Sequence, residues 1–291
     1  MKIADKWQDY QIIATGDGFK LERWDSVYLL RPDPQVIWPS QIEYNSFKKL
    51  NAKYCRSETG GGKWQIIKPF PESWNINYKD LTFSIKPMGF KHTGLFPEQA
   101  VNWDIMSTLI KNANRPISVL NLFAYTGGAT VACLKAGASV CHVDSAKGMV
   151  ERAGENCRLS KVGEGKVRFI IDDCLKFVKR EIRRGKKYDA IIMDPPSFGR
   201  GPNGETWKIE SELFNLVKTC TEVLSDNPLF FLINSYTTGL QPQVIKNILA
   251  LNMQNFGGVI DAYEVGLPTD EQIALPCGCS GIWTESGIIE E

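Results

Sequence analysis

The chain has 291 residues, and its 34 lysines and arginines nearly balance its 33 acidic residues, which leaves a formal net charge of +1. This length suits one large domain with an appendage, or two domains. The near-neutral charge excludes a uniformly basic protein, but a local basic patch is enough to bind nucleic acid. No apolar run approaches the ~20 residues of a membrane span, and residues 1–6 lack an apolar signal core.

The eight cysteines form neither a metal-binding pattern nor a disulfide pattern. No C-x-x-C pair occurs, and Cys277 and Cys279 are too close together for zinc-finger spacing. Most of the cysteines are expected to be small buried apolar residues. We therefore expect a soluble, reduced, cytoplasmic protein without a metal and without a membrane partner.

Residues 1–90 are predicted to form a small β-rich domain. Short apolar segments alternate there with turn signals such as Gly16-Asp17-Gly18 and Arg31-Pro32-Asp33-Pro34. The expected strands lie at 10–14, 27–30, 64–67 and 81–85. A connecting segment follows, in which Pro97 and Glu98 have the chemistry of a helix start.

Residues 91–291 are assigned to a single α/β domain. From residue 117 onward, predicted strands and helices alternate, which is the pattern of a mostly parallel sheet covered on both faces. The strands are expected at 117–123, 139–143, 166–171, 188–193 and 229–233. Segments 259–263 and 281–284 are expected to close the sheet as its last pair.

The first of these strands leads into Phe123-Ala124-Tyr125-Thr126-Gly127-Gly128, a glycine turn before a short helix. Such a turn presents free backbone N–H groups to a ligand. Asp144 ends the next strand, 17 positions after Gly127, close to the offset at which a carboxylate meets ribose hydroxyls. The turn lacks the G-x-G-x-x-G of dinucleotide folds, and no G-x-x-x-x-G-K-[ST] phosphate loop occurs. A nucleoside cofactor without phosphates, typically S-adenosylmethionine, fits best, and a purely structural βαβ unit is the alternative.

Carboxylates follow three of the predicted strands. Asp144, Asp172-Asp173 and Asp194 stand at these ends, and ligands of open α/β sheets bind outside the carboxyl ends of strands. Each acid alone could instead be a helix N-cap. Together they would serve a nucleoside cofactor, with Asp144 at the ribose and either Asp172 or Asp173 at the adenine amine. Asp194 would then lie nearest the sulfonium and the methyl acceptor.

With these motifs and Asp194-Pro195-Pro196-Ser197-Phe198, roughly residues 80–285 resemble class I S-adenosylmethionine-dependent methyltransferases. More narrowly, the chain is similar to the branch that contains the ribosomal RNA large-subunit cytosine-C5 methyltransferases, although the PUA domain of many members is not apparent. The resemblance implies a Rossmann-like seven-stranded sheet with one antiparallel strand. From the motifs and the resemblance together, the residues expected at S-adenosyl-L-methionine are Phe96, Gln99, Phe123, Ala124, Tyr125, Thr126, Gly127, Gly128, Asp144, Ser145, Asp172, Asp173 and Asp194.

The sequence departs from that branch at its catalytic cysteine, because Asn234-Ser235-Tyr236 follows the fifth strand. Cytosine C5 becomes nucleophilic through covalent addition at C6, so we do not expect cytosine-C5 chemistry. Asp194-Pro195-Pro196 is similar to the motif in which amino methyltransferases accept hydrogen bonds from a target nitrogen, with Phe198 one place after the usual aromatic position. The residues expected at the methyl acceptor are Asp194, Pro195, Pro196, Phe198, Asn234 and Tyr236.

Two further segments could contact RNA. Residues 199–208 are glycine-rich and hold Arg200, Trp207 and Lys208, and residues 176–187 hold seven basic side chains. An ordinary surface loop and a solvated helix face are the alternatives. We expect a methyltransferase acting on a base in RNA, with ribosomal RNA as the class. The competing hypotheses are transfer to a protein side chain or small molecule, a non-catalytic cofactor-binding module, and a nicotinamide dehydrogenase. Both a monomer and a homodimer are compatible with the sequence.

Overall fold

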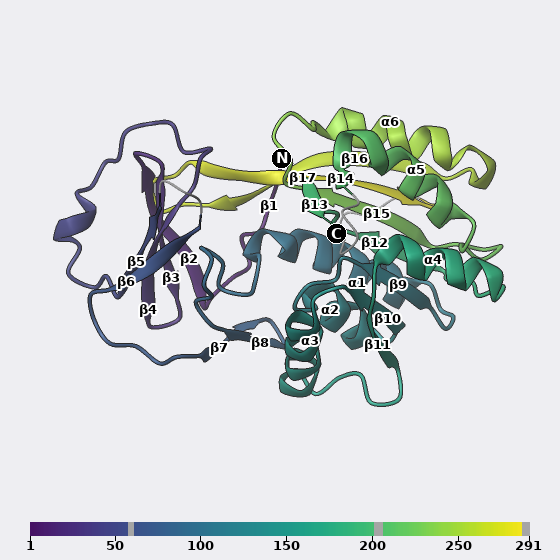
Figure 1. The fold of residues 1–291 in the computed structure, drawn as a ribbon, viewed down its shortest axis with the longest axis horizontal. Helices are drawn as coiled ribbons and strands as arrows, with labels where there is room; N and C mark the ends of the chain where they lie inside the picture. Colours follow the sequence, from purple (N-terminus) through teal and green to yellow (C-terminus); the bar gives the residue numbers. More distant parts are fainter. Residues whose placement is uncertain (58–60, 201–205, 287–291) are drawn as a thin grey trace. The chain divides into compact units, whose positions relative to one another are not determined.

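The computed structural model describes residues 1–57, 61–200 and 206–286 (Figure 1). These residues form two compact units. The larger unit contains Met1–Lys2, Val101–Val265 and the residues from Cys277 onward, and the smaller unit contains Ile3–Ala100 and Gly266–Pro276. The domain division expected between residues 90 and 91 stays a prediction. In the part of the chain that the structure describes, no helix has both the length and the apolar character needed to cross a bilayer.

The larger unit is built on a sheet with the strand order β11-β10-β9-β12-β15-β17-β16-β1. β10 pairs in parallel with β9 and β11, and β12 pairs in parallel with β9 and β15. Apart from the half-exposed edge strand β11, these strands are largely buried, because helices cover the sheet on both faces. Their bounds are Ser118–Leu122 (β9), Ser139–Asp144 (β10), Val167–Ile171 (β11), Ala190–Met193 (β12) and Phe230–Ser235 (β15).

The last strand pair closes the sheet as predicted but is longer than the sequence indicated. β16 spans Val259–Pro268 and β17 spans Ala274–Thr284, and β17 runs antiparallel to β15. The predicted Rossmann-like α/β class with an antiparallel strand is therefore confirmed. β1 (Lys2–Ile3) adds an eighth strand at the edge of the sheet. Two residues are too few to produce a periodic sequence signal.

Helices of the larger unit cover both faces of its sheet (Figure 1). On one face, apolar side chains of α4, α5 and α6 join those of the central strands in one buried cluster that includes Phe177, Leu216 and Ile245. On the other face, α2 lies against α1 and α3. The helices span Ala100–Asn112 (α1), Gly128–Lys135 (α2), Lys147–Leu159 (α3), Cys174–Arg183 (α4), Ile209–Thr221 (α5) and Pro242–Asn252 (α6). Short 3-10 turns lie at Tyr44–Ser46, Pro97–Gln99 and Gln254–Phe256.

The smaller unit is β-rich, as predicted. One sheet has the order β2-β3-β4-β5-β6, and β7 and β8 form a separate pair. The strands span Tyr10–Gly16 (β2), Phe19–Trp24 (β3), Val27–Pro32 (β4), Ala52–Arg56 (β5), Gly62–Ile66 (β6), Trp74–Tyr78 (β7) and Leu81–Ile85 (β8). The sequence did not predict β3, β5 and β7, because charged and polar side chains interrupt their apolar residues.

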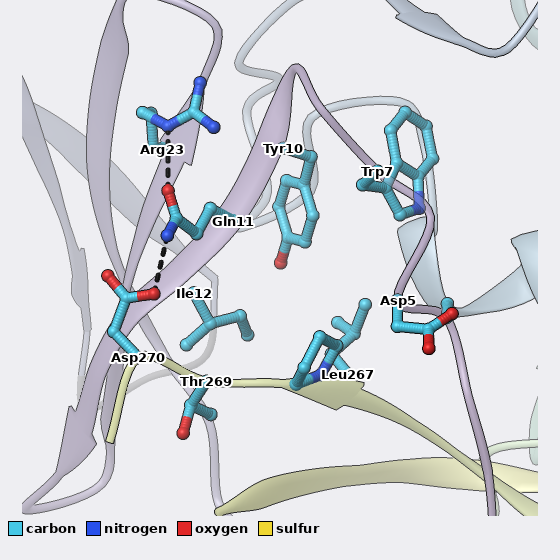
Figure 2. Close-up of a pocket in the computed structure, with 11 residues that line it drawn as sticks. Asp5, Trp7, Tyr10, Gln11, Ile12, Arg23, Leu267, Thr269 and Asp270 are labelled. Carbon is cyan, nitrogen blue, oxygen red and sulfur yellow. Dashed lines mark hydrogen bonds between the residues drawn. The ribbon is translucent and has the colours of Figure 1, made fainter. Parts of the chain in front are cut away.

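A segment from the far end of the chain, Gly266–Pro276, packs on β2 within this unit (Figure 2). The Asp270 amide donates a hydrogen bond of 3.0 Å to the carbonyl of Ile12. The side-chain amide of Gln11 accepts from Arg23 Nε at 3.1 Å and donates to Asp270 Oδ1 at 2.5 Å. These groups line a pocket of about 290 Å³. No local sequence pattern indicates this pairing, because its partners are more than 250 residues apart.

The smaller unit also holds a buried ion pair. Glu22 is fully buried and accepts two hydrogen bonds from the Arg31 guanidinium, at 2.5 and 2.6 Å, and one from the Tyr10 hydroxyl at 2.7 Å. Burial, the largest single effect, raises the pKa of Glu22, but the charges of Arg31 and Lys20 and the hydrogen bonds from Arg31 and Tyr10 together outweigh it, so the pKa is lowered. Removing one charge of such a pair leaves the other desolvated and uncompensated.

We expect Glu22→Gln to lower the free energy of opening of β3 and β4 by about 3–5 kcal/mol at pH 7, measured by amide hydrogen exchange. The folded-state pKa of Glu22 is lowered, so its contribution is present above the ordinary glutamate pKa of about 4.3 and is lost as the pH falls through the folded value. The difference between wild type and variant should therefore shrink in acid. Glu72→Gln, in an exposed pair with Lys86, is the control and should change little. An unchanged free energy of opening in Glu22→Gln would contradict the stabilising role assigned to the Glu22–Arg31 pair.

Candidate active site

The glycine turn between β9 and α2 passes through three residues in the left-handed region. Phe123, Tyr125 and Gly127 have φ values of 54°, 50° and 82°. Two of them are not glycine, and a left-handed backbone at such residues costs on the order of 1–3 kcal/mol unless the surroundings fix it. Here backbone hydrogen bonds fix it, because Phe123 N–H donates to Cys174 Sγ at 3.2 Å and Ala124 N–H donates to the Val143 carbonyl at 3.1 Å.

Asp144 connects the end of β10 to this turn. One carboxylate oxygen accepts from the Tyr125 N–H at 2.9 Å, and the other accepts from the Ala146 N–H at 2.8 Å. The N-cap position of α3 is Ala146, so Asp144 is not that helix's cap. Ser145 is exposed beside it. A half-buried carboxylate is thereby held at the strand end, next to the turn, where the sequence predicted a ribose contact.

Both glycines of the turn are required by close packing. A Cβ built on Gly128 would lie 2.7 Å from the Trp103 ring of α1, and a Cβ on Gly127 would lie 2.8 Å from the Ala153 Cβ of α3. Such distances do not occur between real atoms, so a larger residue would push the turn away from these helices. The glycines therefore let the start of α2 pack closely against α1 and α3.

A buried set of polar side chains beneath the turn was not predicted. The Asn121 amide donates to Thr130 Oγ1 at 2.9 Å, and Thr130 Oγ1 lies 2.9 Å from His142 Nδ1. Asn121 and His142 are register partners on β9 and β10. Burial lowers the pKa of His142 to about 4, so the ring is neutral near pH 7. The signal available in the sequence was the presence of polar residues inside apolar strands.

The two acids that follow β11 have different local partners. Asp173 is the N-cap of α4 and accepts from the Lys176 N–H at 2.8 Å. Asp172 accepts from the Asp173 N–H at 2.8 Å and forms an ion pair with Arg180. The N-cap alternative therefore holds for Asp173. A contact of either carboxylate with adenine stays a prediction.

The structure brings together two of the residues expected at the methyl acceptor. Asp194 follows β12, and its Oδ1 accepts a hydrogen bond of 3.0 Å from the side-chain amide of Asn234 in β15. Pro195 is buried, Pro196 is exposed, and Tyr236 is half-buried just after β15. The Asp-Pro-Pro segment therefore leaves the sheet at the position where β12 and β15 end side by side.

The segment predicted as a glycine-rich loop contains a short hairpin of β13 (Phe198–Arg200) and β14 (Thr206–Lys208). Residues 201–205 of that segment lie outside the described residues. The Trp207 indole N–H donates to the Pro196 carbonyl at 2.6 Å, and its ring lies 6.1 Å from the Phe123 ring. Trp207 therefore packs on the Asp-Pro-Pro turn. Phe198 is 51% exposed, with the Arg200 guanidinium over its ring.

Phe96 and Gln99 belong to the smaller unit. Phe96 is the N-cap of the 3-10 turn that Gln99 ends, and its ring lies 5.4 Å from that of His92. Their expected contact with the cofactor stays a prediction.

The remaining candidates converge on one edge of the larger sheet. The glycine turn, Asp144, Asp172-Asp173, Asp194 and Asn234 stand at or follow the carboxyl ends of β9, β10, β11, β12 and β15, which are neighbouring strands. Parallel strands present their carboxyl ends at the same edge, where α/β folds bind ligands. The turn lacks a phosphate-binding motif, and Asp144 offers a carboxylate. Both features fit a nucleoside with free ribose hydroxyls.

Comparisons with known proteins agree with this arrangement. The crystal structure of an S-adenosylmethionine-dependent methyltransferase from Agrobacterium tumefaciens is 30% identical and has a TM-score of 0.91, over 98% of this chain and 94% of that one. The ribosomal RNA large subunit methyltransferase K/L of Shewanella frigidimarina is 33% identical over 223 residues, which are 76% of this chain and 29% of that protein. The ribosomal RNA large subunit methyltransferase I of Escherichia coli is 42% identical over 81 residues, which are 28% of this chain and 20% of that protein.

The chain spans less than a third of the length of these two curated relatives. The family model of the S-adenosylmethionine-dependent methyltransferases matches residues 46–232, which include the glycine turn and all four strand-end acids. The expected cofactor is thereby confirmed, as is the predicted relationship to the ribosomal RNA methyltransferase branch. On the strand-end site and these matches, the chain belongs to the S-adenosylmethionine-dependent methyltransferases.

Proposed function

We propose that this enzyme methylates a base in RNA, and that ribosomal RNA is its substrate class. The observation that carries the proposal is the outer face of the β13–β14 hairpin, directly after Asp194-Pro195-Pro196. An exposed aromatic ring, Phe198, stands there beside Arg200, with Lys208 paired opposite Phe198. Proteins recognise unpaired bases by stacking on aromatic side chains and hold the adjacent phosphates with cations. The names of the two curated relatives support the same class.

A basic surface on α4 supports an RNA substrate. Lys176, Lys179 and Arg183 are exposed and follow each other at spacings of three and four, which places them on one face of the helix. Nearby acids are already engaged, since Asp172 pairs with Arg180 and the buried Glu181 pairs with Arg184. A chain of net charge +1 thus concentrates positive charge beside the candidate site, as a polyanion requires.

The proposed chemistry is transfer to a nitrogen of the base. S-adenosylmethionine supplies an electrophilic methyl group when it is bound. The carboxylate of Asp194 and the carbonyl of Pro195 would accept hydrogen bonds from the target nitrogen and turn its lone pair toward that methyl group. The protein's contribution is then mainly orientation for in-line transfer.

A covalent route through Cys220 has no support in the structure. Asn234 and Tyr236 stand where the resembled branch carries its nucleophile. Cys220 is fully buried in α5, and burial raises the pKa of its thiol. A thiol that stays protonated is a poor nucleophile. This favours nitrogen over cytosine C5 as the acceptor atom.

The proposed cofactor contacts follow the strand order. Asp144 would accept from the ribose hydroxyls, and the turn Phe123–Gly128 would lie under the methionine part. Asp172 or Asp173 would meet the adenine amine, and Phe96 and Gln99 remain proposed cofactor contacts. A ribosomal RNA substrate would place the protein in the cytoplasm.

We expect Asp144→Ala to weaken S-adenosylmethionine binding by roughly 100-fold in isothermal titration calorimetry. The change removes a charged acceptor for the ribose and also frees the Tyr125 N–H that fixes the turn. Glu151→Ala, an exposed residue of α3 paired with Lys147, is the control and should bind normally. Equal affinity of Asp144→Ala and wild type would remove Asp144 from the site.

We expect the wild-type protein to transfer tritiated methyl groups from S-adenosylmethionine to total RNA of a strain that lacks the gene. Asp194→Ala should lose at least 100-fold in rate, because the target nitrogen loses its acceptor. Cys220→Ala should label RNA at the wild-type rate, whereas a covalent cysteine route would abolish it. Nucleoside analysis then distinguishes nitrogen from carbon. Labelled protein or metabolites with unlabelled RNA would overturn the RNA proposal.

We expect the combined variant Lys176→Ser, Lys179→Ser and Arg183→Ser to bind RNA less tightly and with a weaker salt dependence. Removing three phosphate contacts should reduce the slope of log K against log salt concentration by about 2–3, in filter binding to ribosomal RNA. Lys111→Ser, Lys135→Ser and Lys246→Ser together remove the same charge from exposed positions elsewhere and should leave the slope nearly unchanged. Equal slopes for the two triple variants would show that α4 is only a solvated face.

A further inference from the structure

A chain of buried hydrogen bonds ends on Asp194. The Tyr263 hydroxyl donates to Asn102 Oδ1 at 2.8 Å, and the Asn102 amide donates to Ser280 Oγ at 2.9 Å. The Ser280 hydroxyl donates to Asn234 Oδ1 at 2.9 Å, and the Asn234 amide donates to Asp194 Oδ1 at 3.0 Å. Tyr263, Asn102, Ser280 and Asn234 are each no more than 6% exposed.

The sheet register makes this chain possible. Ser280 of β17 stands directly opposite Asn234 of β15, so the two side chains leave neighbouring strands on the same face. Tyr263 lies on β16, the next strand, and Asn102 lies in the first turn of α1. A slip of one residue in the β15–β17 pairing would turn Ser280 to the other face and break the chain.

All four donors point the same way. Each amide accepts on its oxygen and donates from its nitrogen, so the orientation of one side chain fixes the next. An ionised carboxylate only accepts hydrogen bonds, and it is the group on which such a series of donors can end. The arrangement therefore suits Asp194 as an oriented acceptor and disfavours rotation of its side chain.

Packing alone does not explain these residues. Apolar side chains of similar volume fill a core at least as well, and a half-satisfied polar network is worse than an apolar one. Here the four side chains connect three strands and a helix to the one acid beside the methyl acceptor. Buried polar groups arranged in this way specify orientation rather than add stability.

We propose that Tyr263, Asn102 and Ser280 are positioning residues for methyl transfer, which act through Asn234 to hold the Asp194 carboxylate toward the acceptor. This inference rests on the proposed role of Asp194. None of the three touches the reacting atoms. Ser280 is the central link, since it accepts from Asn102 and donates to Asn234.

The test measures the series of hydrogen bonds and the methyl-transfer reaction separately, in the protein of 291 residues. The side-chain amide of Asn234 is followed in ¹H–¹⁵N spectra and assigned by its loss in Asn234→Asp. It should shift in Ser280→Ala and also in Tyr263→Phe, three hydrogen bonds away. Ser280→Thr keeps a hydroxyl and should restore the wild-type signal. Thr284→Val is the control, because Thr284 is another buried residue of β17 and takes no part in this series of hydrogen bonds.

Methyl transfer to total RNA from the strain lacking the gene is then compared. Ser280→Ala should lower kcat about tenfold, with the KM for S-adenosylmethionine within about twofold of wild type. Ser280→Thr should recover most of the rate. In an Asp194→Ala background, Ser280→Ala should have no further effect, because the carboxylate that the chain orients is gone.

The outcomes separate the inference from the proposed function. If the chemical shift of the Asn234 side-chain amide changes in neither Ser280→Ala nor Tyr263→Phe, the inference is overturned, whatever the result with RNA. A responding signal with unchanged kcat, in a protein that labels RNA, overturns the positioning role. A responding signal in a protein that labels no RNA overturns the RNA substrate and leaves the orientation of Asp194 supported.

Discussion

The parallel pairing of β9 with β10 and β12 is the constraint on which the candidate site depends. The carboxyl ends of parallel strands lie at the same edge of the sheet, so each further strand places one more polar residue at that edge. The pairing places Asp144 beside the turn from β9, so that its carboxylate accepts the Tyr125 N–H. One hydrogen bond thereby connects a strand end to the left-handed turn that follows its neighbour. The turn keeps its shape through contacts made by other strands.

Buried polar side chains complete this arrangement on the face of the sheet that α1 and α2 cover. Asn121, Thr130 and His142 lie beneath the glycine turn, and Asn234 and Ser280 lie beneath the Asp-Pro-Pro turn. Buried polar groups are costly unless they are paired, and these side chains form hydrogen bonds with one another, while His142 Nε2 is buried without a partner among the described residues. The glycine turn and the Asp-Pro-Pro turn thus each lie over hydrogen-bonded side chains of the sheet. A ligand that binds at this edge meets groups whose orientation is already fixed.

The smaller unit depends on a different interaction. Its buried Glu22–Arg31 pair fixes β3 against β4, and the segment Gly266–Pro276 joins β2 through backbone and side-chain hydrogen bonds. β16 and β17 run from the larger unit into this one. The chain therefore passes four times between the units, once near its start, once at α1 and twice through this strand pair.

The sequence by itself determined the fold class and the cofactor, and it indicated the edge of the sheet where the candidate site lies. Apolar runs, the glycine turn and acids at strand ends are local patterns, and each is readable without knowing its partners. Tertiary structure alone decided which acids cap helices, why the glycines are needed, and which distant residues support the turns. Asn102 and Ser280 are 178 positions apart, and strand register and helix packing bring them together. Those contacts follow from the whole fold, so no window of sequence contains them.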